Sequence, residues 1–178
     1  MNTTILIVPS PETAALAPAL AAAAGIAFGQ KCAVSDRALD VAAAFDPFRR
    51  QYRSTALLTH LEKRFPEPFR VLGVTSVDLF VPVLTFVFGE AQVNGRCAVV
   101  SSFRLDEQQY GLPPDPPLLV ERLTKEAIHE LGHTFGLRHC DDWTCVMHSG
   151  EAVERLDLKT ARLCERCQSR RRRGVTRW

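Results

Sequence analysis

The sequence predicts an α/β fold, in which a mixed twisted sheet with an antiparallel edge strand packs on helices. Strand-like and helix-like runs alternate along the first half, and an Asn-Gly pair separates two later strand-like runs. Hydrophobic residues make up 46% of the chain, which is enough to fill a core. A length of 178 residues suits one globular domain.

The N-terminal segment is expected to form a buried strand followed by a helix. The apolar run 5–8 predicts the strand, and Ser10-Pro11 is typical of a helix start. The alanine-rich stretch 14–24 has some of the composition of a signal peptide. It lacks a preceding basic segment, however, follows Glu12 and contains Pro18. No apolar run looks long enough to span a bilayer. We therefore expect a cytoplasmic chain that does not enter a membrane.

The middle of the chain is expected to contain a second helix and most of the sheet. The helix is predicted over about residues 46–65, with Asp46 as its N-cap and Pro47 as its first residue. Strand-like runs follow at 71–74, 78–81, 84–89 and 97–103. Asn94-Gly95, between the last two runs, is typical of a tight hairpin. An antiparallel strand is therefore expected near the edge of the sheet.

A proline-rich loop, residues 111–117, leads to the helix that carries the most informative motif. Asp115 can cap this helix, and Pro116-Pro117 occupy positions whose backbone N–H groups would lack helical partners. Apolar residues recur every four positions and give the helix one apolar face: Leu119, Leu123, Ala127 and Leu131.

The helix contains His129-Glu130-Leu131-Gly132-His133. Residues four apart share a helix face, so His129 and His133 can reach one metal ion. Glu130 lies beside that ion, where a carboxylate can take a proton from a zinc-bound water. A five-residue pattern of this kind is a modest signal by itself, and two ordinary surface histidines are the alternative interpretation.

The residues after the helix extend the motif. Gly136 can adopt a left-handed conformation and end the helix, which allows the chain to turn back. His139 could then reach the same ion. Three neutral nitrogen ligands leave a fourth position open for water, as in catalytic zinc sites. The extended spacing predicts a catalytic zinc site formed by His129, His133 and His139.

Four of the six cysteines lie in the C-terminal part, as two close pairs. Four residues separate Cys140 from Cys145, and two separate Cys164 from Cys167. Two close pairs joined by a longer connection are the usual layout of a four-thiolate zinc site. Buried reduced thiols, or disulfides in an exported chain, are the alternatives. The other two cysteines are expected to be buried core thiols: Cys32 and Cys97.

These motifs together resemble the archaemetzincin family of metzincin zinc metallopeptidases. The resemblance rests on His129-Glu130-x-x-His133-x-x-Gly136-x-x-His139-Cys140, then Cys145-x-Met147, then Cys164-x-x-Cys167. Runs 71–75, 78–80 and 86–91 also resemble the family, so the resemblance extends over nearly the whole chain. In metzincins a methionine turn lies beneath the three histidines, and Met147 has this place. Ser149 stands where some metzincins have a zinc-binding tyrosine.

The resemblance implies a compact metzincin-like peptidase domain with two zinc ions per chain, one catalytic and one structural. It implies hydrolysis of peptide or protein substrates by a zinc-bound water, with Glu130 as general base. We expect a single domain, 1–178. Its N-terminal subdomain, 1–138, would contain the active-site helix. Its C-terminal subdomain, 139–178, would contain the methionine turn and be stapled by the four-cysteine zinc.

The remaining features bear on partners and on alternative functions. A net charge of +2 is too small to indicate nucleic acid binding, and the arginine run 170–173 is expected to be a solvated, frayed terminus. We expect a monomer. A zinc-dependent binding module and a catalytically weak metzincin are the alternative functions.

Substrate binding is predicted only in outline. An extended peptide could pair with a free strand edge near residues 97–103. Aminopeptidase and endopeptidase activity both stay open. The former would need an anionic group near the substrate amine, for which Glu90 and Asp106 are candidates.

Overall fold

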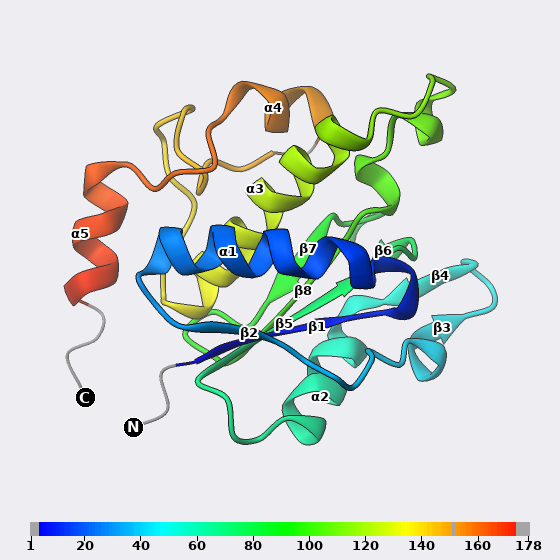
Figure 1. Ribbon diagram of the computed structural model, residues 1–178. Coiled ribbons are helices and arrows are strands. Elements are labelled where there is room, and N and C mark those ends of the chain that lie inside the picture. The colour runs from blue at the N-terminus through cyan, green and yellow to red at the C-terminus, as the bar shows by residue number, and fades with distance from the viewer. Residues whose placement is uncertain (1–3, 151, 174–178) are drawn as a thin grey trace.

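The computed structural model describes residues 4–150 and 152–173, in which helices cover both faces of a central sheet (Figure 1). The sheet has the strand order β2-β1-β5-β8-β7, and only β7 is antiparallel to its neighbour. Its strands are β1 (Ile5–Pro9), β2 (Cys32–Val34), β5 (Arg70–Thr75), β7 (Gly89–Ala91) and β8 (Cys97–Ser101). The predicted α/β class, with a mixed sheet and an antiparallel edge strand, is confirmed.

Two hydrophobic cores lie on opposite faces of this sheet. Helices α1 (Ala17–Phe28) and α3 (Pro116–Thr134) cover one face, and α2 (Ser54–Arg64) covers the other. Successive residues of β5 enter different cores, Val71 on the α2 side and Leu72 on the α1 and α3 side. Both faces of the strand are therefore buried, which explains its continuous apolar sequence.

The N-terminal strand is where the sequence predicts it, but the helix after it begins as a 3-10 turn, η1 (Pro11–Leu16). By length and composition alone, the stretch Pro11–Phe28 is apolar enough to cross a membrane, contrary to the expectation that no run is long enough. Within this fold its buried side chains pack into the core beside the sheet: Thr13, Ala17, Leu20, Ala24 and Phe28.

The helix predicted over residues 46–65 is wrong in its first part. Strands β3 (Phe45–Asp46) and β4 (Gln51–Arg53) form a hairpin there, and β4 pairs with β6 (Leu79–Phe80) in a second, small sheet. The Asp46 carboxylate accepts the backbone N–H groups of Phe48 and Arg49 at 3.0 and 3.1 Å. It closes a turn between two strands, and α2 begins only at Ser54.

The strand predicted at 84–89 is also largely wrong. Residues 84–88 make one isolated bridge, Val87 to Leu79, and β7 begins at Gly89. The Asn94-Gly95 hairpin is confirmed, and Asn94 has a left-handed φ of 59°. Since β5 and β7 flank β8, the strand in segment 97–103 offers no free edge, and the edge strand on this side of the sheet is β7.

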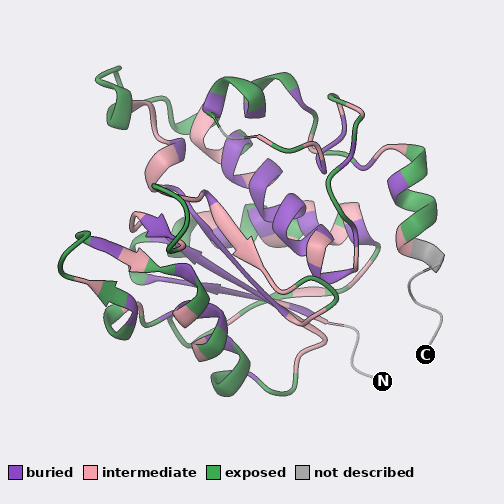
Figure 2. Cartoon of the chain, turned by 180° about the vertical axis from the view of Figure 1, so that it is seen from behind, coloured by how far each residue is buried: buried purple, intermediate pink, exposed green. Residues whose placement is uncertain are grey.

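The C-terminal half of α3 is almost entirely buried (Figure 2). Five further elements complete the described part of the fold. They are the 3-10 helices η2 (Ala42–Ala44), η3 (Phe103–Leu105) and η4 (Glu107–Tyr110) and the helices α4 (Val153–Leu158) and α5 (Glu165–Arg173). The arginine run belongs to α5, so its expected fraying is wrong. Arg171 donates a hydrogen bond of 2.5 Å to the Phe28 carbonyl and ties α5 to the end of α1.

Candidate functional site

Local interactions define both ends of α3. The Asp115 side chain accepts the N–H of Leu118 at 3.0 Å, so it caps the helix as the sequence predicts. After Thr134 the chain reverses at Gly136, whose φ of 82° belongs to the left-handed region. Glycine reaches this region without steric cost, which explains its position here. The reversal carries His139 back toward the helix.

The three histidines converge, and one nitrogen from each can lie within 4.8 Å of the others. His129 Nδ1 is 2.8 Å from the Val146 carbonyl, and His133 Nδ1 is 2.8 Å from the Leu137 carbonyl. A carbonyl only accepts, so each Nδ1 carries the proton and each Nε2 keeps a lone pair. The two Nε2 atoms are 3.1 Å apart. Lone pairs that face each other at this distance repel, so the arrangement fits a shared cation.

The surroundings hold these imidazoles in the neutral form that binds metals. Burial, followed by the positive charge of Lys159, lowers the pKa of His129 well below its usual value. Burial also lowers the pKa of His133 and of the more exposed His139. The donor set, its geometry and its protonation all fit zinc.

Glu130 lines a cleft of about 440 Å³ beside the histidines. The residues that line this cleft come from three segments: Leu84, Thr85, Phe86, Val87, Phe88 and Gly89; Glu126, His129 and Glu130; His139, Ser149 and Gly150. Burial, then the neighbouring Glu126 carboxylate, raises the pKa of Glu130 well above its usual value. A carboxyl with a raised pKa accepts a proton readily, as a general base must.

Glu126 and Lys159 form a buried ion pair that the sequence analysis missed. Glu126 lies one turn before Glu130 on α3 and lines the cleft, and its Oε1 accepts from Lys159 Nζ at 3.1 Å. The same ammonium group donates to the His148 carbonyl at 3.0 Å. Lys159 therefore connects the active-site helix to the segment after Met147. The four-residue spacing from Glu126 to Glu130 is a signal for a shared helix face, but nothing in the sequence indicates Lys159 as the partner.

Gly89 is a second residue that the sequence analysis missed. A Cβ atom there would lie 2.6 Å from the Val99 carbonyl oxygen and 2.7 Å from Glu130 Cγ. The absence of a side chain allows β7 to pass directly against the proposed base.

Gly89→Ala should lower turnover and destabilise the fold, by about 1–3 kcal/mol, because the added methyl group must displace Glu130 or the strand backbone. Thermal unfolding and steady-state peptide cleavage would measure both effects. Gly25→Ala is the matched control, since its nearest neighbour would be 3.4 Å away. Equal turnover in the two variants would contradict this role of Gly89.

Met147 is fully buried against the C-terminal end of α3. A Cβ atom on Gly132 would lie only 2.4 Å from Met147 Sδ, so the thioether packs on the helix between the two histidines. The neighbouring Val146 carbonyl orients His129, and the Met147 carbonyl accepts the Cys140 N–H at 2.9 Å. This turn therefore contacts both the histidines and the start of the cysteine cluster.

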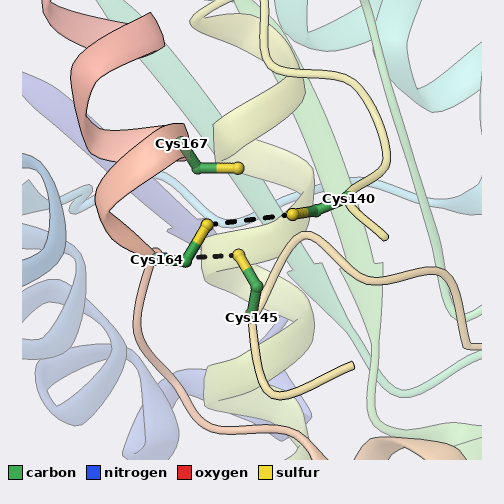
Figure 3. Close-up of side chains that lie close together, drawn as sticks. All are labelled: Cys140, Cys145, Cys164 and Cys167. Atoms are coloured by element: carbon green, nitrogen blue, oxygen red, sulfur yellow. Dashed lines mark hydrogen bonds between the residues drawn. The ribbon is translucent and has the colours of Figure 1, made fainter. Parts of the chain in front are cut away.

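The four C-terminal cysteines also converge, and their sulfur atoms all lie within 4.8 Å of one another (Figure 3). Cys140 and Cys145 come from the loop after α3, Cys164 from just before α5 and Cys167 from α5 itself. Cys140 Sγ is 3.8 Å from Cys164 Sγ. All six cysteines of the chain are free of disulfides. Four free thiols in this arrangement fit a tetrahedral zinc site.

Cys140 is already biased toward the thiolate that binds metals. Burial opposes ionisation, but hydrogen bonds, the Arg166 guanidinium first among them, lower the pKa of the Cys140 thiol to about 7. Arg166 Nη2 is 3.3 Å from Cys140 Sγ. Of the two isolated cysteines, Cys97 is a buried core thiol whose pKa burial raises to about 11, whereas Cys32 is only half-buried.

The two carboxylates suggested for binding a substrate amine are committed elsewhere. Glu90 accepts hydrogen bonds from Ser54 Oγ at 2.5 Å and from Thr55 Oγ1 at 3.0 Å, at the start of α2. Asp106 caps η4 by accepting the Gln108 N–H at 2.9 Å. Among the described residues, the carboxylates that line the cleft are Glu126 and Glu130.

Comparisons with known proteins agree with this geometry. The model of peptidase family M54 matches residues 41–173. The archaemetzincin of Methanopyrus kandleri is 47% identical over 134 residues, which cover 75% of this chain and 73% of that protein. The archaemetzincin of Thermococcus kodakarensis is 42% identical, over 74% and 72% of the two chains.

Solved structures are similar over nearly the whole fold. The crystal structure of the Methanopyrus kandleri archaemetzincin matches with a TM-score of 0.86 and 37% identity, over 99% of this chain and 97% of that one. A zinc-dependent peptidase from Methanocorpusculum labreanum matches with a TM-score of 0.86 and 28% identity, over 94% and 99%.

Proposed function

Because the chain belongs to peptidase family M54, the archaemetzincins, we propose that it hydrolyses peptide bonds with Glu130 as general base beside a zinc ion held by three histidines. The chain is a zinc metallopeptidase, and peptides or proteins are its substrates. The observation that carries the proposed residue roles is the pair of unprotonated Nε2 atoms, 3.1 Å apart, next to a buried carboxyl in the same cleft.

His129, His133 and His139 would hold the catalytic zinc. Zinc bound there would supply a Lewis acid that lowers the pKa of a coordinated water to roughly 7 and polarises the scissile carbonyl. Glu130 takes the proton of the attacking water and then delivers it to the leaving amine. The Val146 and Leu137 carbonyls keep the His129 and His133 rings in the tautomer that presents Nε2.

We assign a second zinc to Cys140, Cys145, Cys164 and Cys167. It would join the loop after α3 to the start of α5 and so close the C-terminal part of the domain. Free thiols and a thiolate cluster suit a reducing compartment, which supports a cytoplasmic location.

Internal cleavage is the better supported specificity. An aminopeptidase needs an anionic group for the substrate amine. The ion pair with Lys159 already engages Glu126, and Glu130 is assigned to proton transfer. Glu90, a third candidate, is occupied by Ser54 and Thr55.

Metal analysis combined with a peptide library would test this function. We expect two zinc ions per chain and cleavage that a chelator abolishes and added zinc restores. The histidine site has an open position and should lose its zinc first, whereas the closed thiolate site should retain its zinc longer.

Acetylating the peptide N-termini should leave cleavage intact if the enzyme cuts internally. A single zinc per chain would contradict the paired sites. Full activity in a chain stripped of both ions would contradict the proposed mechanism.

A further inference from the structure

We propose that Arg49 and Gln51 are positioning residues for peptide binding, because they clamp the cleft wall, residues 84–88, by its backbone carbonyls. The inference rests on the proposed peptidase function. It assigns a role to the β3–β4 hairpin, which lies outside the zinc sites.

The cleft wall has little secondary structure of its own. Its backbone meets strands at two points, where Val87 N–H donates to the Leu79 carbonyl at 2.9 Å and Ser101 N–H donates to the Phe88 carbonyl at 2.8 Å. The adjoining part forms a turn, in which Leu84 N–H donates to the Val81 carbonyl at 3.0 Å. Leu84 is 53% exposed, so apolar packing alone does not fix this part of the wall.

Side chains from the hairpin supply the missing contacts. Arg49 Nη2 donates to the carbonyls of Leu84 and Thr85, at 2.7 and 3.0 Å. Gln51 Nε2 donates to the same Thr85 carbonyl at 2.9 Å. Two consecutive carbonyls of the wall are thus held from outside the cleft by three hydrogen bonds.

Both clamp residues are themselves fixed. Arg49 Nε donates to Gln51 Oε1 at 3.0 Å, and its guanidinium carbon lies 4.2 Å from the centre of the Phe80 ring. Gln51 Nε2 also donates to Asp78 Oδ2 at 3.0 Å. The planar guanidinium fixes Nε and Nη2 relative to each other, so the bond to Gln51, the bonds to the two carbonyls and the contact with Phe80 form together.

The network continues to the middle of the wall. Asp78 accepts from Arg104 Nε and Nη2, at 2.9 and 2.6 Å. The Arg104 guanidinium carbon lies 4.8 Å from the centre of the Phe86 ring, and Phe86 lines the cleft. The clamp therefore connects the backbone at residues 84 and 85 with the side chain at 86.

A pre-ordered wall reduces the cost of binding a peptide. Without the clamp, water would solvate the carbonyls of Leu84 and Thr85, and substrate would have to order the segment on binding. The clamp does not touch Glu130 or the histidines. Its loss should therefore raise KM and leave the chemical step largely intact.

The test compares Arg49→Ala with Arg50→Ala. Arg50 is the adjacent, exposed arginine of the same turn, and its side chain makes no hydrogen bond, ion pair or ring contact within the described part of the chain. We expect Arg49→Ala to raise KM roughly tenfold, with kcat within about twofold of the parent and unchanged zinc content. Amide hydrogen exchange of residues 84–88, measured without substrate, should become faster in Arg49→Ala and stay unchanged in Arg50→Ala.

Arg49→Lys should recover KM only in part, because an ammonium group lacks the planar face that lies over Phe80 and the fixed spacing between Nε and Nη2. An unchanged KM in Arg49→Ala, or an equal rise in Arg50→Ala, would overturn the proposal. A fall in kcat that parallels a loss of thermal stability would also overturn it, since it would indicate a merely structural role. If the parent chain cleaves no peptide, the peptidase mechanism fails, and exchange of residues 84–88 still decides whether the clamp exists.

Discussion

Glu130→Gln should reduce kcat by roughly 10²-fold or more while zinc stays bound at the histidines. Glutamine has nearly the same shape as glutamate, but its amide cannot take a proton from the attacking water. Glu130 lies between His129 and His133 on α3 and is buried in the cleft, so no other described carboxylate has the same relation to both ligands. Steady-state cleavage and zinc content per chain measure the two parts of this expectation.

Glu121→Gln is the matched control, because Glu121 is an exposed residue of the same helix that pairs with Lys125. It should keep parental turnover. Turnover of Glu130→Gln within a few-fold of the parent would refute the assignment of Glu130 as base. Such a result would also favour a catalytically weak enzyme if the parent rate itself is low.

Glu130→Gln should also stabilise the metal-free protein at neutral pH. Burial raises the pKa of Glu130 in the folded protein above its value in the unfolded chain. At pH values between these two pKa values, the native state therefore binds more protons than the unfolded chain. The stability that this group contributes is therefore present at low pH and is lost as the pH rises. A neutral amide in place of Glu130 removes the cost of burying a charged carboxylate at higher pH. Chemical unfolding of the metal-free parent and the metal-free variant at pH 5 and pH 8 would measure this difference in stability.

Cys164→Ser should remove the structural zinc and destabilise the whole domain. Apparent binding free energies of structural zinc in small peptides are about 10–16 kcal/mol, so even partial loss is large against the stability of a domain. Cys164 Sγ is 3.8 Å from Cys140 Sγ, and its backbone N–H points at Cys145 Sγ at 3.4 Å. The substitution removes the sulfur that faces Cys140 and leaves the backbone bond to Cys145 in place, so its effect on Cys145 would come through loss of the shared zinc.

We also expect this variant to weaken zinc binding at the histidines, by about 10- to 100-fold, the range found when supporting contacts of a metal ligand are lost. His139 directly precedes Cys140, whose N–H is bonded to the Met147 carbonyl and whose carbonyl meets His148 Nδ1 at 2.9 Å. Releasing Cys140 would free this segment, and ordering it again costs conformational entropy.

Competition with a chelator would measure zinc affinity at the histidine site. Cys32→Ser is the control, because Cys32 is half-buried in β2 and lies outside the cluster. If Cys164→Ser loses its thiolate-bound zinc but still binds zinc at the histidines as tightly as the parent does, the two sites are independent.

Features that depend on neighbours along the chain could be predicted from the sequence. Asp115 caps α3 and Gly136 takes a left-handed φ through contacts within a few residues, and Gly95 N–H donates to the Gln92 carbonyl in the turn of the β7–β8 hairpin. The histidine site follows the same logic, because the pitch of one helix places His129 and His133 on one face. Such geometry needs no knowledge of the rest of the fold.

Asp46 shows where local information was insufficient. As a helix cap and as the start of a turn, an aspartate makes the same contact, accepting backbone N–H groups two or three residues ahead. Only tertiary pairing separates the two outcomes. Here β4 pairs with β6, and Arg49 and Gln51 bind the cleft wall, so the segment is a hairpin.

The sequence by itself therefore determined the α/β class and indicated zinc chemistry, and it predicts the metal-ligand sets, because these depend on residue type and on short spacing. The tertiary structure alone decided which groups surround that chemistry. Lys159 pairs with Glu126 from 33 residues away, and Gly89 brings β7 against Glu130. Contacts between distant segments depend on how the whole chain packs, and no local pattern encodes them.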